Sequence, residues 1–187
     1  MARTWLSVAV ELLGGRGHEL WPPPGRTFAV GPAHSFDDLA DAINTAFARW
    51  DRGHLSLFDL ADGNIVTDVE SGIELADSTA GPTSRAFDSA RAKVTMLLEP
   101  GDVCRFTFDL GDRWVHQCTV HSPKIDPAIT LGIVPAAPLP YCGWGTIPDQ
   151  YGRRTADDDG SGKVRERPNH RHPMLDFAWP HHEDRPR

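Results

Sequence analysis

The chain has few cysteines and no long hydrophobic run. Its 187 residues include three cysteines, Cys104, Cys118 and Cys142, and none of them forms a Cys-x-x-Cys pair. This pattern predicts neither a disulfide framework nor a structural zinc site. No apolar segment approaches the ~20 residues that span a bilayer, and the N-terminal segment alternates like a strand instead of forming a signal-peptide core. We therefore expect a cytoplasmic protein without a membrane segment.

The familiar catalytic motifs are absent as well. The sequence contains no G-x-x-x-x-G-K-[ST] loop, no G-x-S-x-G elbow and no H-E-x-x-H helix, which excludes the enzyme classes built on them. We expect no cofactor and no resident metal. Four histidines near the C-terminus could chelate a metal: His170, His172, His181 and His182. Because they lie in a charged tail, we expect them to give only a non-specific affinity for metal ions.

Positive charge is scarce in most of the chain. Net charge is −7, and residues 1–151 carry 11 Lys or Arg against 19 Asp or Glu. Nucleic-acid-binding domains usually present a basic patch, so this composition argues against nucleic acid as a partner of residues 1–151. Residues 152–187 carry 8 basic and 7 acidic residues and few apolar ones. We predict one domain over 1–151 and a charged, largely disordered tail over 152–187.

The residue pattern predicts several strands and one clearly marked amphipathic helix. Residues 5–13 alternate as a strand, and an extended segment follows over 18–30, with Pro22–Pro24 at an edge or bulge. The stretch "SFDDLADAINTAFARW" has an N-cap at Ser35, a capping-box acid at Asp38 and an apolar stripe that continues to Trp50. A strand from residue 55 leads to a turn at Asp62-Gly63.

The second half is less regular. For residues 70–92 we predict a loop with at most a short helical piece. For the stretch "KVTMLLEPGD" we predict a strand or a short helix. Residues 103–121 predict a β-hairpin, and the chain after Pro123 shows little periodicity. The fold class that follows is α+β: a mixed, largely antiparallel sheet with one main amphipathic helix packed on a face, plus short helical pieces.

The hairpin turn "FDLGDRWVH", residues 108–116, concentrates polar chemistry. With an even loop, for example Gly111-Asp112, Asp109 pairs with Trp114, His116 lies on the same face, and Phe106 and Phe108 face the core. With an odd loop, Trp114 packs beside Phe108, and Cys104 comes opposite Cys118. A one-residue slip exchanges the two faces of a strand. We predict the even loop, because Gly-Asp suits a two-residue turn.

An even loop would place an acid, an indole and an imidazole on one accessible face. His116 could then act as a general base with Asp109 or Asp112. In the other interpretation, Asp112 caps the turn, Trp114 covers a hydrophobic layer and His116 is a hydrogen-bonded strand residue. We favour this structural interpretation over catalysis, since isolated Asp/His proximity is common.

Three blocks of the sequence resemble the plasmid pRiA4b ORF-3-like family. The hairpin is similar to the family pattern (Y/F)-x-(Y/F)-D-F-G-D-x-W-x-H, with Leu110 in place of the usual Phe. The upstream block matches at Trp21, Leu39, Ile43, Ala46, Trp50, His54, Leu55 and Phe58. The segment "PYCGWGTIPDQYG" is similar to the family's closing segment at Cys142, Gly145, Pro148 and Asp149, without its double proline and final glycines.

The resemblance implies an α+β domain, and it implies no established activity. Some members are labelled as passengers of transposable elements or as a resolvase. A serine resolvase needs a nucleophilic serine near arginines and a DNA-binding helix-turn-helix. Here Ser7 lies in an apolar strand and Ser35 caps a helix, and no DNA-reading helix follows. We therefore do not expect recombinase activity.

Three hypotheses follow for function. The first is a non-enzymatic module that binds an unknown protein or small ligand. Its candidate binding residues are Asp109, Asp112, Trp114, His116, Cys142, Trp144 and Tyr151. The alternative is a hydrolase that uses His116 with Asp109 or Asp112. The third is a DNA-associated accessory protein of a mobile element, acting through the arginine-rich tail.

Overall fold

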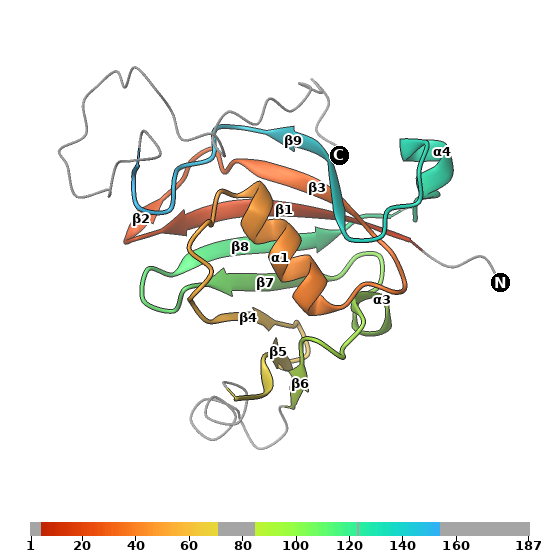
Figure 1. The fold of residues 1–187 in the computed structure, drawn as a ribbon, viewed down its shortest axis with the longest axis horizontal. Coiled ribbons are helices and arrows are strands. Elements are labelled where there is room, and N and C mark those ends of the chain that lie inside the picture. Colours follow the sequence, from red (N-terminus) through yellow and green to blue (C-terminus); the bar gives the residue numbers. More distant parts are fainter. Residues whose placement is uncertain (1–4, 71–84, 123, 154–187) are drawn as a thin grey trace.

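One sheet forms the frame of the molecule (Figure 1). The structure, a computed structural model, describes residues 5–70, 85–122 and 124–153. Within them nine strands form one sheet in the order β6-β5-β4-β7-β8-β1-β3-β9, with β2 paired to β1. The strands are β1 Leu6–Gly15, β2 His18–Glu19, β3 Gly25–Val30, β4 Ser56–Asp59, β5 Ile65–Thr67, β6 Ala86–Asp88, β7 Val103–Phe108, β8 Trp114–Val120 and β9 Leu139–Trp144. Every pair is antiparallel except β5 with β6.

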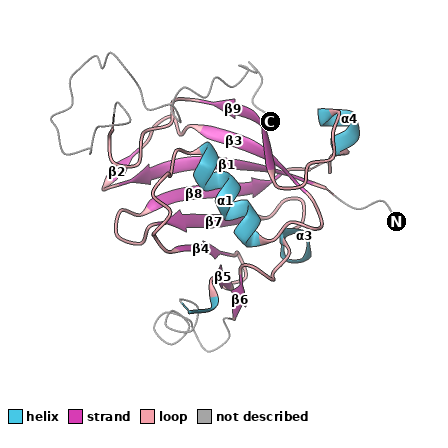
Figure 2. Cartoon of the chain, viewed as in Figure 1, coloured by secondary structure: helices cyan, strands magenta, loops and turns pink. Residues whose placement is uncertain are grey.

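One long helix covers a face of this sheet. Figure 2 shows α1, Phe36–Ala46, lying across the central strands. Two short helices, α3 Val94–Leu97 and α4 Pro127–Leu131, lie outside that layer. The predicted fold class is confirmed: the sheet is mixed and mostly antiparallel, with one main helix packed on it. No helix in the described ranges is long and apolar enough to cross a membrane.

The start of α1 follows from local chemistry. The Ser35 hydroxyl accepts a hydrogen bond from the Asp38 amide, and the Asp38 carboxylate accepts one from the Ser35 amide at 2.7 Å. This is the predicted capping box. The apolar stripe is buried on the sheet, where the Phe36 ring meets Phe58 edge-to-face at 5.0 Å. Leu39 and Ile43 are fully enclosed by the same core, so burial of this stripe fixes the helix on the sheet.

Three elements differ from the sequence prediction. The helix ends at Ala46 although the apolar stripe continues, because Phe47 caps it and Ala48 adopts a left-handed φ of 56°. Residues 139–144 form β9, whose Pro140 and Gly143 hide the strand pattern; such residues are tolerated at a sheet edge. The ambiguous segment 70–92 contributes the short β6, and its residues 71–84 lie outside the described part of the chain, as does most of the predicted tail.

The predicted even loop of the hairpin is wrong. Phe108 pairs with Trp114 and Phe106 with His116, so the loop has five residues, 109–113. The longer turn forms because Asp109 and Arg113 both adopt left-handed backbone angles, with φ of 58° and 51°. The Asp109 side chain closes it by accepting hydrogen bonds from the Gly111 and Asp112 amides. Trp114 and His116 consequently lie on the same face as the phenylalanines.

Candidate functional site

Trp114 and His116 belong to the core of the protein. Trp114 is 4% exposed and His116 is fully buried. The His116 ring stands between the rings of Phe47 and Phe106, at 4.8 and 5.4 Å. The Trp114 ring packs so closely on Gly15 that a Cβ there would overlap the indole. The accessible face that was expected around the indole and imidazole is therefore not formed by these two residues.

The surroundings of His116 keep it uncharged. Burial, reinforced by the nearby Arg49 cation, lowers the pKa of His116 to about 3. Its Nδ1 lies 3.4 Å from the Phe106 carbonyl oxygen, and its Nε2 has no hydrogen-bond partner among the described residues. A general base must reach a substrate proton. A fully buried imidazole without a carboxylate partner does not meet this requirement.

A different histidine meets a carboxylate from the hairpin. We call Asp51, His54, Asp109 and Tyr151 the His54 cluster. His54 Nδ1 lies 3.2 Å from Asp109 Oδ2, and His54 Nε2 lies 2.8 Å from the Tyr151 hydroxyl and 3.4 Å from Asp51 Oδ2. The Tyr151 hydroxyl donates to Asp51 Oδ2 at 3.0 Å. The His54 side chain is 32% exposed, so this cluster reaches solvent.

The hydrogen bonds of the His54 cluster depend on where its protons are. With both ring nitrogens protonated, His54 donates to Asp109 and to the Tyr151 oxygen, while the tyrosine donates to Asp51. With Nε2 unprotonated, the tyrosine hydroxyl can donate its one proton either to His54 or to Asp51, but not to both. Burial, followed by the neighbouring carboxylates, raises the pKa of Tyr151 to about 12. The phenol therefore keeps its proton at neutral pH and acts as a hydrogen-bond donor.

Asp109 connects the turn of the hairpin to this cluster. One of its carboxylate oxygens closes the β7–β8 loop, and the other faces His54. Its backbone amide donates to the Leu55 carbonyl at 2.8 Å, next to His54. The side chain is 10% exposed. The conformation of the loop and the orientation of the imidazole are thus set by the same residue.

The segment after β9 completes the cluster. Gln150 holds the backbone of Asp51, accepting from its amide at 3.0 Å and donating to its carbonyl at 3.3 Å. Asp149 accepts a hydrogen bond from the Trp50 indole nitrogen at 2.9 Å. The Trp50 ring in turn meets the Tyr151 ring edge-to-face at 5.2 Å. Residues 149–151 are therefore fixed against the turn that carries His54.

A buried arginine supports this end of the sheet from inside. Arg49 is fully buried, and its guanidinium lies 3.7 Å from the centre of the Trp114 ring. It donates to the carbonyls of Phe47 and Pro148, each at 2.6 Å. Burial lowers the pKa of Arg49 to about 9, which leaves it charged at neutral pH. It thus ties the segment after β9 to the end of α1.

The other predicted site residues lie at different places. Asp112 is next to the cluster: its carboxylate is 3.6 Å from Arg16 Nε, and the Arg16 guanidinium lies 5.9 Å from the Tyr151 ring centre. Cys142 pairs with Thr27 across the β3–β9 ladder. The Trp144 indole donates to the Pro23 carbonyl at 3.1 Å. Cys142 and Trp144 therefore pack against the β3 edge, and of the predicted set only Asp109, Asp112 and Tyr151 come together.

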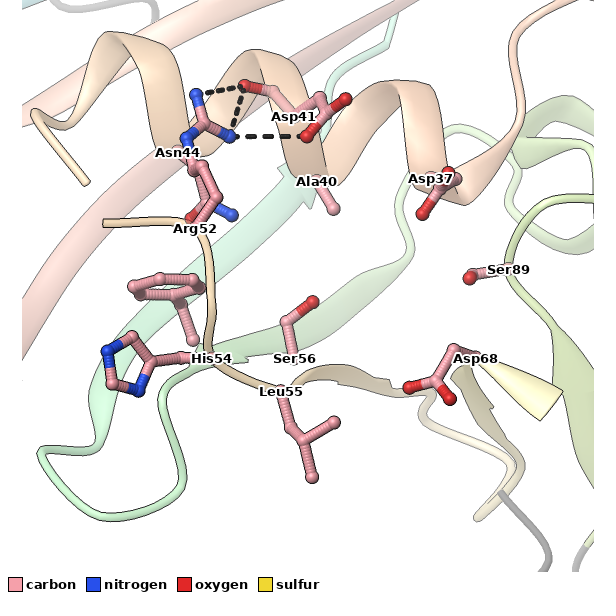
Figure 3. A pocket seen from close by; sticks show the side chains of 11 residues that line it. Asp37, Ala40, Asp41, Asn44, Arg52, His54, Leu55, Ser56, Asp68 and Ser89 are labelled. Carbon is pink, nitrogen blue, oxygen red and sulfur yellow. Dashed lines mark hydrogen bonds and ion pairs between the residues drawn. The ribbon is translucent and has the colours of Figure 1, made fainter. Parts of the chain in front are cut away.

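A cavity adjoins the His54 cluster (Figure 3). Its volume is about 210 Å³, and it lies between α1 and the start of β4. Figure 3 shows Asp37 of α1 facing Asp68 across it, Asp41 bonded to Arg52 beside the helix, and His54 at one side. The described residues contain no group of three or more histidine, cysteine or acidic side chains placed to hold a metal ion.

A family comparison now bears on the site. The model of the plasmid pRiA4b ORF-3-like protein family matches residues 7–132. The chain belongs to the pRiA4b ORF-3-like family. The match covers His54 and Asp109, whereas the pRiA4b ORF-3-like region ends before Asp149, Gln150 and Tyr151. The three sequence blocks that carried the resemblance meet in the folded protein, because residues of each one contact the His54 cluster.

The structural comparison supports the fold of this pRiA4b ORF-3-like protein. It is similar to the crystal structure of the protein of unknown function MM3350 from Methanosarcina mazei Go1, with a TM-score of 0.54 and 17% sequence identity. The similarity covers 76% of this chain and 70% of the other. A search of curated proteins gave no match. These findings establish the family and the fold and identify no activity.

Sequence reasoning missed the centre of the cluster. It named His54 only among the residues that match the family pattern, and it did not consider Asp51 or Arg49 as site residues. The signal that could have found His54 was its position in the resembling block, since that block, the hairpin and the closing segment were each noted separately. Nothing local indicated that they meet, because Tyr151 lies 97 residues after His54.

Proposed function

We propose that this chain is a binding module that takes a small ligand in the cavity between α1 and β4, with the His54 cluster at its rim. The observation that carries the proposal is the cavity itself, about 210 Å³ in volume, with mostly polar residues in its lining. Its walls come from α1, from β4 and β7, and from connecting residues that include Arg52, Asp68 and Ser89. The side chains on the helix and the strands hold a ligand more firmly than those on loops do.

The chemistry of the cluster favours binding over turnover. The raised pKa of Tyr151, about 12, makes its phenol a poor nucleophile at neutral pH. Asp109 already accepts two amide hydrogen bonds within the turn. His54 is held between two carboxylates, Asp51 and Asp109. The cluster is thus a rigid set of donors and acceptors, which orients a ligand at the cavity rim.

Filling the cavity should abolish binding. Ser56→Phe places a phenyl ring in the lining and keeps a residue type that suits a strand. Ligand-detected NMR with a mixed panel of organic cations, anions and neutral polyols should identify binders of the wild-type chain, and the variant should lose them. Ile129→Phe adds the same ring on α4, where residue 129 is 84% exposed, and should keep binding. Equal binding by Ser56→Phe, or no binder at all, would contradict the proposal.

A hydrolase is the second candidate, and one observation favours it. Asp109, His54 and Tyr151 form a chain of carboxylate, imidazole and hydroxyl, with contacts of 3.2 and 2.8 Å. The same order of groups occurs in nucleophilic hydrolases. In this arrangement His54 takes the role that was considered for His116, and Asp109 keeps its own.

Activity assays on His54→Ala separate the two candidates. If the chain is a binding module, hydrolysis of ester, amide and phosphomonoester substrates by the wild type should not exceed that by His54→Ala. Removing a general base from a hydrolase lowers the rate by about 10²–10⁴-fold. A loss of that size in His54→Ala, with His18→Ala unaffected, would establish the hydrolase and refute the binding-only proposal. His18 is an exposed residue of β2 and serves as the matched control.

A further inference from the structure

Two of the three cysteines face each other across the β7–β8 hairpin. Cys104 of β7 is paired with Cys118 of β8 in the ladder. Both carry free thiols, and both are buried in the hydrophobic core. The third cysteine, Cys142, is paired with Thr27 at the β9 edge, and β1 and β3 lie between β9 and β8. At about 4.8 Å per strand this separates Cys142 from Cys118 by roughly 14 Å, so the fold brings together Cys104 and Cys118 and leaves Cys142 apart.

The spacing of directly opposed residues suits a disulfide between Cys104 and Cys118. Opposed residues of an antiparallel pair have Cα atoms about 4.5 or 5.5 Å apart, within the range of about 4.4–6.8 Å that disulfides join. Their Cβ atoms lie about 4.5–5.5 Å apart, whereas a disulfide needs about 3.5–4.5 Å. The two strands must therefore approach each other slightly. Cys104 is the second residue of β7, which begins at Val103, so a small shift of this strand end is sufficient.

The two thiols differ in their readiness to react. Hydrogen bonding by the Cys104 side chain, together with burial, raises the pKa of the Cys118 thiol well above its ordinary value. Because the thiolate is the reactive form, Cys118 reacts slowly with an oxidant on its own. Cys104 is next to Val103, which is 44% exposed. A small oxidant therefore reaches Cys104 first, and Cys118 lies in position to react with the oxidised sulfur.

We infer that Cys104 and Cys118 are a site of oxidative cross-linking and form a disulfide when the folded protein meets hydrogen peroxide. The Cys104 thiolate attacks one peroxide oxygen, which gives a sulfenic acid and a hydroxide that combines with the proton lost by Cys104. The Cys118 sulfur then attacks the sulfenic sulfur. The S–S bond forms, the S–O bond breaks, and the hydroxyl leaves as water with the Cys118 proton. Two thiols are oxidised to one disulfide, and one peroxide is reduced to two waters.

The cross-link closes the hairpin that carries Asp109. The loop from Cys104 to Cys118 contains about 15 residues, and closing such a loop restricts the unfolded chain. Asp109 lies within the loop and faces His54 from it. Oxidation therefore fastens the two strands that position this contact. The inference does not depend on the proposed ligand, since neither cysteine lines the cavity between α1 and β4.

Peptide mapping of the full chain tests the inference, because trypsin separates the three cysteines. Cleavage after lysine and arginine places Cys104 in peptide 94–105, Cys118 in peptide 114–124 and Cys142 in peptide 125–153. The folded protein is treated with hydrogen peroxide, and its remaining thiols are blocked with iodoacetamide. Mass spectrometry should then find peptide 94–105 joined to peptide 114–124, and dithiothreitol should separate them. The oxidised protein should also unfold at a higher urea concentration than the reduced protein.

Variants and a denatured sample provide the controls. Cys104→Ala should abolish the link, and Cys142→Ala should leave its yield unchanged; circular dichroism checks that both variants are folded. Protein oxidised in concentrated urea should give links that include Cys142, because the unfolded chain brings all three thiols into contact. Three results for the folded wild type would each overturn the inference: a link that involves Cys142, oxidation of Cys104 to a sulfinic acid without a link, or no cross-link at all.

Discussion

Replacing Trp114 with alanine is expected to lower the free energy of unfolding by about 3–5 kcal/mol. The indole is 4% exposed, pairs across the hairpin with Phe108 and packs on the backbone of Gly15. It also forms the surface on which the buried Arg49 cation lies, 3.7 Å from the ring centre. The substitution removes the ring, opens a cavity and leaves a buried charge without its aromatic contact. Urea denaturation followed by circular dichroism measures the effect.

Trp21→Ala is the matched control for this experiment. Trp21 is 92% exposed, so its removal should change the free energy of unfolding by no more than about 0.5 kcal/mol. The same chemical change thus gives a large effect at one site and almost none at the other. Similar losses in both variants, or a loss below about 1 kcal/mol in Trp114→Ala, would contradict the position of Trp114 in the core.

The second large effect is a pH dependence of stability caused by His116. Its pKa is about 3 in the folded protein, and an unfolded histidine titrates near its ordinary value of 6.5. Below pH 6.5 the unfolded chain therefore binds a proton that the folded chain does not. The stability contributed by the neutral ring is present above pH 6.5 and is lost as the pH falls toward 3, at about 1.4 kcal/mol per pH unit.

Comparison with His116→Leu isolates this contribution. Over the window from pH 6 to pH 4, the difference in free energy of unfolding between wild type and variant should shift in favour of the variant by about 1.4 kcal/mol per pH unit. Contributions from the carboxylates and from His34, whose pKa is also lowered by burial, are shared by both proteins and cancel. His18→Ala should keep the wild-type dependence, because His18 is exposed. Parallel pH profiles for wild type and His116→Leu would contradict a buried neutral imidazole.

The sequence predicted elements whose cause is local. The capping box at Ser35 and Asp38, the apolar stripe as far as Ile43 and the turn after β4 each depend on neighbouring residues and formed as expected. The helix itself ended earlier than the stripe did. The hairpin over residues 103–121 was also expected, but its register was not. Both loop lengths satisfy the local pattern, because either face of β8 can present a mixture of apolar and polar side chains. The Asp109 side chain decides between them by closing a five-residue loop.

The candidate site was harder to predict because its contacts span the chain. Asp109, Asp112 and Tyr151 were chosen from the sequence. Asp109 and Tyr151 contact His54, which was named only as a match to the family pattern, and Asp112 lies beside them, paired with Arg16. Trp114 and His116 were chosen for their chemistry, and the register places them in the core. Long-range pairing determined both results: the β7–β8 register buried one histidine, and the docking of residues 149–151 surrounded the other with partners.

The attachment of residues 148–151 has a consequence for dissecting this protein into fragments. A fragment that ends at residue 132, where the family match ends, would lack β9 and the Pro148 carbonyl. The edge of β3 would then offer unpaired backbone amides and carbonyls to other molecules, which promotes self-association. Of its two acceptors among the described residues, the Arg49 guanidinium would keep the Phe47 carbonyl and lose the Pro148 carbonyl. Expression boundaries for functional work should therefore lie beyond Arg153.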